Sequence, residues 1–242
     1  MESSSQTVIS AQNGDRVLVI MAKAPRPGAV KTRLVPSLPL EAVTAFYRCL
    51  LDDTLALAQS LGVEVAIMCP DSDVKELAQL AGRGATVVAQ KGTGLAAGLT
   101  SVFAHFARDS QRRIIAFNSD SPHLPPSVLE EAFETLAAHD VVVGPTYDGG
   151  YYLVGAKGSH PTLFTGDGMG TSSALERLLS RAGALELSVG FADRFYDIDI
   201  ADDLSRLAEE LRVAPARAPR TAQWLKEWEL AASQSRTSTG EL

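Results

Sequence analysis

The sequence contains little of what marks secreted or membrane-embedded proteins. Only two of its 242 residues are cysteines, Cys49 and Cys69, so neither a disulfide framework nor a cysteine-based zinc cluster is indicated. No apolar run approaches the roughly 18 residues of a membrane span. The first 15 residues are polar and lack the basic start and apolar stretch of a signal peptide. These absences lead us to expect a soluble, cytoplasmic protein that does not act at a membrane.

Positive charge is also scarce in the chain as a whole. It has 22 lysines and arginines against 29 aspartates and glutamates, which gives a formal net charge of −7. A protein of this charge is a poor general ligand for nucleic acids or anionic membranes, so we expect neither as a partner. The overall charge therefore does not explain a cluster of cations, which must be explained by its own position in the fold. With 45% hydrophobic residues, the chain has an ordinary globular composition and can bury a large core.

Short apolar runs alternate with segments of helical periodicity up to residue 144. The runs are nearly continuous and rich in β-branched residues, which is typical of strands covered on both faces. The predicted strands span 16–22, 63–69, 85–90, 113–118 and 140–144, and the predicted helices span 40–61, 72–81, 95–108 and 126–138. This alternation predicts an α/β fold, a Rossmann-like three-layer sandwich with a mostly parallel central sheet.

The pattern changes after residue 144, but no linker interrupts the chain before residue 213. Further elements are expected at 147–157 (a turn and a strand), 171–182 (a helix), 184–189 (a strand) and 202–212 (a helix). Trp224 and Trp228 are four residues apart on a last predicted helix, a spacing that indicates docking on the body. We divide the chain into a flexible N-terminal segment at 1–15, a single domain at 16–213, a linker and C-terminal docking helix at 214–232, and a disordered tail at 233–242.

Four cations gather in one short segment, KAPRPGAVKTRL at 23–34, directly after the first predicted strand. Its two prolines and Gly28 disfavour a regular helix, so we expect a loop. A solvated surface loop is the simple alternative, because most lysines and arginines are exposed. The glycine spacing of a Walker A loop is absent. As a phosphate-binding loop, it would use Lys23, Arg26 and Gly28 to bind the nucleotide, and Lys31 and Arg33 in catalysis.

Two carboxylates follow other predicted strands. Asp120 lies in NSDSPHLP after 113–118, and Asp199 lies in YDIDIADDL after the last predicted strand. Ligands bind beyond the carboxyl ends of the strands in open α/β sheets, where both segments would meet the basic loop. Cations facing carboxylates suit a polyphosphate bridged by Mg²⁺ or Mn²⁺. We predict that Asp120 and Asp199 bind the metal, that Asp120 also takes part in catalysis, and that Ser119 binds the nucleotide. The simpler alternative for each aspartate is that it makes a local turn or caps a helix.

The segment YDGGYY at 147–152 combines a Gly-Gly turn with an aspartate and several tyrosines. Gly-Gly makes a turn on its own, and a turn is the simplest account of the segment. An aspartate at such a turn can also hold a polar group of an acceptor molecule. The candidate acceptor-binding residues are therefore Asp148, Gly149, Gly150 and Tyr151.

Four segments, in the same order along the chain, resemble one protein family. They are VIMAKAPRPGAVKTRL (19–34), NSDSPHLP (118–125), VVVGPTYDGGYYLVG (141–155) and LF…GTSSALERLL (163–179). Together they resemble the rSAM/selenodomain-associated transferases, often labelled glycosyltransferases of arsenosugar biosynthesis. That family belongs to the nucleotide-diphospho-sugar transferase superfamily, whose fold is called GT-A. The phospholactate guanylyltransferases and the molybdenum-cofactor nucleotidylyltransferases share this fold.

The resemblance implies roles for several residues. Asp120 would be the metal-binding acid that follows the central strand, and Asp199 in DIADDL would be a second metal ligand. The loop after the first strand would bind a triphosphate. The segment KGTGLAAGL at 91–99 is similar to the base-binding turn of the guanylyltransferases, which implies nucleotide binding by Gly94 and Leu95.

Two enzymatic reactions fit these residues. Several cations and a second carboxylate favour nucleotidylyl transfer from an NTP to a small, phosphorylated acceptor with release of pyrophosphate. The alternative is a GT-A glycosyltransferase that moves a sugar from an NDP-sugar to a small-molecule acceptor. A second alternative is a non-catalytic nucleotide-binding module. Nothing in the sequence indicates the oligomeric state.

Overall fold

The predicted sheet is present in the computed structural model, which describes residues 15–107, 112–165 and 172–239. It has seven strands in the order β3-β2-β1-β4-β6-β5-β7. The strands are β1 (Arg16–Met21), β2 (Glu64–Cys69), β3 (Thr86–Ala89), β4 (Arg113–Asn118), β5 (Val141–Pro145), β6 (Tyr151–Lys157) and β7 (Val189–Phe191). Except for Asp15, the predicted N-terminal segment lies outside the described residues.

One strand runs against its neighbours and makes the sheet mixed. β6 is antiparallel to both β4 and β5, whereas the other four neighbouring pairs are parallel. Only residues 146–150 join β5 to β6, and the Thr146 N–H donates to the Gly150 carbonyl at 3.0 Å. So short a connection reverses the chain, because a parallel crossover needs a dozen or more residues. The sheet is mostly parallel, as the sequence predicts.

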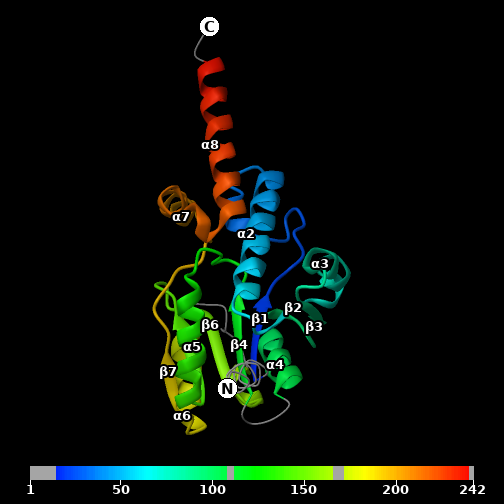
Figure 1. The fold of residues 1–242 in the computed structure, drawn as a ribbon, viewed down its shortest axis with the longest axis vertical. Helices are drawn as coiled ribbons and strands as arrows, with labels where there is room; N and C mark the ends of the chain where they lie inside the picture. Colours follow the sequence, from blue (N-terminus) through cyan, green and yellow to red (C-terminus); the bar gives the residue numbers. More distant parts are fainter. Residues whose placement is uncertain (1–14, 108–111, 166–171, 240–242) are drawn as a thin grey trace, which may run out of the picture.

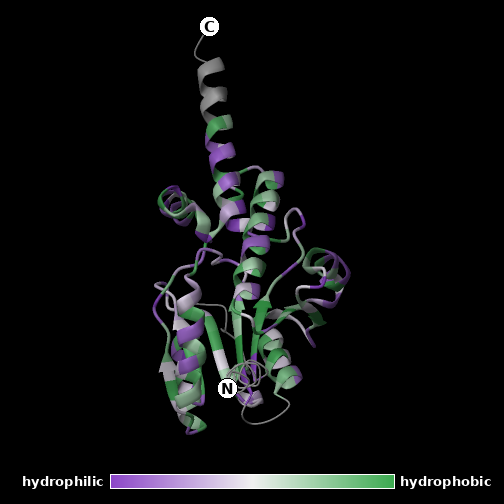
Figure 2. Ribbon diagram, in the orientation of Figure 1, coloured by the Kyte–Doolittle hydropathy of each residue, from purple (hydrophilic) through white to green (hydrophobic). Residues whose placement is uncertain are grey.

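Helices cover both faces of this sheet (Figure 1). They are α2 (Leu40–Ser60), α3 (Val74–Ala81), α4 (Gly94–Phe106), α5 (Pro126–Ala138), α6 (Ala174–Ala184), α7 (Ala201–Val213) and α8 (Pro219–Thr239). In β1, Leu18 and Ile20 share a core with α2, α3 and α5, whereas Val17 and Val19 share a second core with α4 and α6. Because strand side chains alternate between faces, burial of both faces produces a continuous apolar run. The strands are accordingly hydrophobic along their length (Figure 2), and the three-layer prediction is confirmed.

The C-terminal helix α8 packs on α2 and then projects beyond the body (Figure 1). Trp224 lies against Phe46 of α2, with ring centroids 5.0 Å apart, and stacks on Trp228. Residues 233–239 continue the helix where the sequence suggested a tail. Serine and threonine make up most of residues 233–239 and have weak helix propensity, so local propensity did not predict this extension.

A buried carboxylate anchors the start of α8. Asp53 of α2 is 1% exposed and accepts hydrogen bonds from the backbone N–H groups of Arg220 (3.2 Å) and Thr221 (2.8 Å). These are among the N–H groups that a helix N-terminus leaves without an intrahelical partner. Asp53 therefore caps a helix that begins 166 residues later in the chain.

The predicted strand at 184–189 is misplaced. Helix α6 continues to Ala184, the Leu187 N–H donates to the Ala182 carbonyl at 2.9 Å, and Glu186 has a left-handed φ of 54°. These features turn the chain, so β7 begins only at Val189, where it pairs with Val141. Within the described residues, none of the helices has the length and apolarity needed to cross a membrane.

Candidate active site

The carboxyl ends of β1 and β4 define the ligand-binding edge of the sheet. The chain leaves β1 toward β2 on one side, while β4 lies on the other, and a crevice forms at such a switch point. The basic loop after β1 and the loop beginning at Ser119 after β4 border this crevice. A third segment, which follows β7, joins them because the Ile198 N–H donates to the Asp120 carbonyl at 3.3 Å.

Lys31 lies between the two predicted metal ligands. Its Nζ is 2.9 Å from Oδ2 of Asp120 and 2.9 Å from Oδ1 of Asp199, and its side chain is 4% exposed. Burial alone lowers the pKa of Lys31, but the charges of the two carboxylates outweigh it and raise the pKa above its usual value. Arg33 reaches the same Asp199, with Nη1 3.2 Å from Oδ2, from an exposed position.

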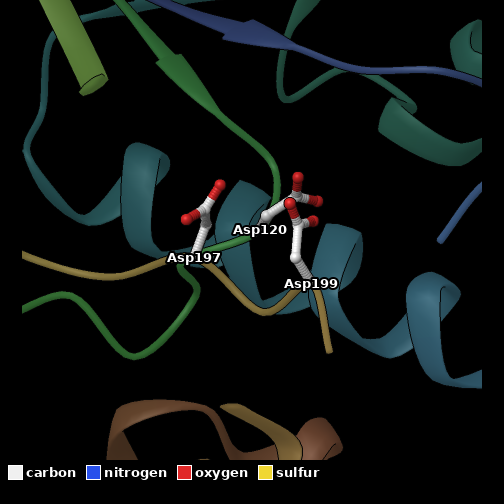
Figure 3. A group of neighbouring side chains, drawn as sticks. All are labelled: Asp120, Asp197 and Asp199. Carbon is white, nitrogen blue, oxygen red and sulfur yellow. The ribbon is translucent and has the colours of Figure 1, made fainter. Parts of the chain in front are cut away.

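Three carboxylates form the acidic part of the site. Asp120, Asp197 and Asp199 each place one oxygen within 4.8 Å of the others, and their carboxyl groups point to the same side (Figure 3). Burial, followed by the charge of Asp199, raises the pKa of Asp197 to about 6. Carboxylate oxygens are the hard donors that Mg²⁺ and Mn²⁺ prefer, so the donor set fits either ion.

Tyr47 of α2 connects the loops that carry these groups. Its hydroxyl lies 3.0 Å from Oγ of Ser119, donates to the Lys23 carbonyl at 3.2 Å and accepts from the Lys23 N–H at 3.2 Å. Burial, followed by the charge of Asp120, raises the pKa of Tyr47 to about 12. The hydroxyl therefore stays protonated and holds the start of the basic loop beside the loop of Asp120.

Arg26, which the sequence predicts to bind the nucleotide, pairs with acidic residues of another segment and not with Asp120 or Asp199. Its guanidinium pairs with Asp73 (2.8 Å) and Glu76 (2.9 Å), and its Nη2 donates to the Ser72 carbonyl at 3.0 Å. Neither Arg26 nor Gly28 lines the two cavities described below. Arg26 instead ties the basic loop to α3, and Gly28 provides a left-handed turn with φ of 75°.

The first cavity has a volume of about 490 Å³ and opens from the carboxylates toward β2 and β3. Three predicted cations, Lys23, Lys31 and Arg33, line it together with Ser119, Asp120 and Asp199. At the far end it is lined by Met68, Pro70, Gln90, Gly94 and Leu95. The cavity thus has a charged end beside the carboxylates and a less polar end at the start of α4.

The second cavity, of about 700 Å³, adjoins the first on the side of β6 and contains most of the predicted acceptor residues. Asp148, Gly150 and Tyr151 line it, as do all three acidic residues of the site. Oδ1 of Asp148 accepts from the Thr146 hydroxyl at 2.5 Å and the Gly150 N–H at 3.2 Å, and these bonds lower the pKa of Asp148. The Tyr151 hydroxyl is buried and has no hydrogen-bond partner among the described residues.

Gly149 shapes the turn without lining the second cavity. Its φ is 90°, and a Cβ there would lie 2.1 Å from the Ser172 carbonyl oxygen. Both facts require glycine, because the neighbouring atom is backbone and cannot move aside. Gly149 therefore fixes the position of Asp148 and the contact between this turn and the start of α6.

Sequence reasoning missed Asp197 and Tyr47. Asp197 alternates with Asp199 in DID, and alternate residues of an extended segment share a face, so the signal was present. Tyr47 lies beside Phe46 within an apolar helical pattern, and no local feature indicates that its hydroxyl reaches Lys23 and Ser119.

Comparisons with known proteins agree with this architecture. Residues 53–171 match the family model described as an uncharacterized protein conserved in bacteria, DUF2064. No curated protein matches the sequence. A candidate nucleotide-diphospho-sugar transferase from Desulfovibrio desulfuricans G20 is similar in structure, with a TM-score of 0.83 and 25% identity over 91% of this chain and 98% of that one.

Two more distant structures share the fold. A 4-diphosphocytidyl-2C-methyl-D-erythritol synthase from Anaerococcus prevotii DSM 20548 has a TM-score of 0.56 and 12% identity, covering 83% of this chain and 97% of its own. A CMP:2-keto-3-deoxy-manno-octonic acid synthetase complexed with CTP has a TM-score of 0.53 and 13% identity, covering 82% and 99%. The match at 25% identity shows that the chain has the fold of the nucleotide-diphospho-sugar transferase (GT-A) superfamily, and residues 53–171 match the DUF2064 family model.

Proposed function

We propose that the protein is a divalent-metal-dependent nucleotidylyltransferase, which transfers a nucleotidyl group from an NTP to a small-molecule acceptor and releases pyrophosphate. The observation that carries the proposal is the first cavity, where Lys23, Lys31 and Arg33 lie beside Asp120 and Asp199. Three cations match the charge of a triphosphate better than that of a diphosphate. The transferase fold supports the same class of reaction.

The three carboxylates would hold Mg²⁺ or Mn²⁺. When bound, such an ion neutralises phosphate charge and polarises the α-phosphoryl group toward attack. Lys23 and Arg33, which line the first cavity, would bind the β- and γ-phosphates. In the reaction, an acceptor oxygen forms a bond to the α-phosphorus, and the bond from that phosphorus to the bridging oxygen of the β-phosphate breaks. The leaving pyrophosphate takes the electron pair, and the cations of the loop stabilise its charge.

The second cavity is the proposed acceptor site, because it shares Asp120, Asp197 and Asp199 with the proposed metal site. The lowered pKa of Asp148 keeps it ionised, and its second oxygen can accept a hydrogen bond from an acceptor hydroxyl. The buried Tyr151 hydroxyl can donate to another polar atom of the acceptor. Both residues thus favour an acceptor with several polar groups.

Pyrophosphate release tests this reaction. The protein is incubated with Mg²⁺ and each of the four NTPs, with hydroxylated and phosphorylated small molecules as acceptors. We expect acceptor-dependent pyrophosphate from at least one combination, and its loss in Asp120→Asn. Glu131→Gln is the matched control, because Glu131 is exposed on α5 and outside both cavities. Activity that is equal in Asp120→Asn and in the control would contradict the assignment.

Glycosyl transfer is the second candidate, favoured by one observation. The structure with a TM-score of 0.83 is a candidate nucleotide-diphospho-sugar transferase, and its match is closer than those of the nucleotidyltransferases. In that reaction an NDP-sugar would occupy both cavities, and a nucleoside diphosphate would leave. Release of NDP from an NDP-sugar, with no pyrophosphate from any NTP, would favour this candidate.

A further inference from the structure

Lys31 occupies the space in which the proposed metal would lie. Its Nζ is 2.9 Å from one oxygen of Asp120 and 2.9 Å from one oxygen of Asp199. A divalent ion shared by the same carboxylates would lie about 2.0–2.6 Å from its oxygen ligands. The ammonium and the ion would therefore compete for the same oxygens, and their like charges would repel at this separation.

We infer that Lys31 is an internal counter-ion, which a divalent metal displaces from Asp120 and Asp199 toward the phosphates of the nucleotide. This inference rests on the metal site of the proposed function. In the absence of metal, the ammonium neutralises part of a half-buried acidic cluster, whose charges would otherwise repel one another. On displacement, the side chain has room in the first cavity, which Lys31 lines together with Lys23 and Arg33.

The backbone at Lys31 has an unusual conformation that the two ion pairs help to hold. Lys31 has φ of 46° and ψ of 39°, a left-handed conformation that residues other than glycine rarely adopt. Its carbonyl accepts from the Leu34 N–H at 2.9 Å, so it stands at the start of the short helix Thr32–Leu34. The two ion pairs offset the cost of this conformation, and exchanging them for a metal removes part of what holds it.

Displacement also couples metal binding to nucleotide binding. A metal bound alone leaves the Lys31 ammonium without its two carboxylates. A phosphate group in the first cavity offers it new acceptors, so each ligand should bind more tightly in the presence of the other. Removing the ammonium should weaken this mutual enhancement while strengthening the binding of metal alone.

The first experiment measures Mn²⁺ binding without nucleotide, from the electron paramagnetic resonance signal of the free ion. We expect Lys31→Met to bind Mn²⁺ at least tenfold more tightly than the wild type. Lys23→Met is the matched control: it removes one positive charge from the same cavity, but Lys23 makes no ion pair with the acidic cluster. We expect the control to change the affinity less than threefold.

The second experiment uses the wild-type protein and does not depend on the folding of a variant. Amine acetylation is followed by mass spectrometry with and without saturating Mn²⁺. Lys31, which is 4% exposed, should react slowly without metal and several-fold faster with it, whereas Lys23 should react at the same rate in both conditions. We expect this difference because metal would move the Lys31 ammonium away from its two carboxylates and into the first cavity.

The outcomes separate the inference from the proposed function. If Mn²⁺ binds the wild type and Asp120→Asn abolishes this binding, the metal site stands. If Lys31→Met then binds Mn²⁺ no more tightly than the wild type, or Lys31 acetylation does not respond to Mn²⁺, the counter-ion role is wrong. If Mn²⁺ binds to none of these proteins, with or without NTP, the metal site itself is wrong and the inference fails with it.

Discussion

The buried His123 should make the stability of the protein depend on pH. Its side chain is 0% exposed and lies against the rings of Phe195 (4.9 Å) and Tyr196 (4.8 Å), which also contact each other. Neither ring nitrogen has a hydrogen-bond partner within the described part of the chain. Burial, followed by the charges of Arg217 and Arg206, lowers the pKa of His123 to about 3. The imidazole is therefore neutral at pH 7, although a Glu210 oxygen lies 3.8 Å away.

The linkage between proton binding and folding gives the direction and the size of this pH dependence. An unfolded histidine has a pKa of about 6.5, so between pH 6.5 and 3 the unfolded chain binds a proton that the folded protein does not. The contribution to stability is complete above pH 6.5 and declines as the pH falls toward 3. Each pH unit in this window is worth about 1.4 kcal/mol, so about 2 kcal/mol should be lost at pH 5.

His123→Phe isolates this contribution, because it keeps an aromatic ring and removes the ionisation. Urea unfolding at pH 7.5 and pH 5.0 gives the free energy of unfolding of each protein. The decline on acidification should be about 2 kcal/mol smaller in His123→Phe than in the wild type. His105→Gln, on the exposed side of α4, is the control and should decline as the wild type does. Equal declines in the wild type and His123→Phe would refute this reasoning.

Three further predictions concern other parts of the structure. Asp197→Asn should weaken Mn²⁺ binding at least tenfold by removing one carboxylate ligand, as measured by titration; unchanged affinity would remove Asp197 from the site. Asp53→Ala should lower the free energy of unfolding by about 1–2 kcal/mol, because two N–H groups of α8 lose their acceptor, whereas Asp52→Ala, nearer the surface, should cost less. Arg26→Met should leave nucleotide affinity within twofold in isothermal calorimetry, because Arg26 lines neither cavity, and a tenfold loss would restore its phosphate role.

The repeating pattern of the sequence predicted most of the fold. Burial on both faces leaves a continuous apolar run in each parallel strand, and this signal is local, so β1, β2 and β4 were found within a residue or two. The strand at 184–189 was misplaced, because a short apolar run at the end of a helix does not show where the chain turns. The position of β6 between β4 and β5 depends on contacts across the sheet, which periodicity does not reveal.

The site was predictable where residues follow strands and less so where loops meet. Asp120 and Asp199 were expected at the same edge, and the structure brings them together. Arg26 is an equal member of the basic loop by sequence, but its partners Asp73 and Glu76 lie about 50 residues away. The placement of Lys31 between two carboxylates, one of them 168 residues away, likewise depends on how the loops fold against each other.

The relative affinities of nucleotides test the central claim most directly. At a fixed free Mg²⁺ concentration, the protein is titrated with GTP, GDP, CTP, CDP, UTP, UDP and UDP-glucose by isothermal calorimetry. One added phosphate in contact with Lys23 or Arg33 gains a charge-assisted hydrogen bond of about 1.5–3 kcal/mol. A nucleotidylyltransferase should therefore bind at least one NTP about tenfold or more tightly than the matching NDP, and this preference should shrink as salt is raised. Tighter binding of UDP and UDP-glucose than of every NTP would contradict the account.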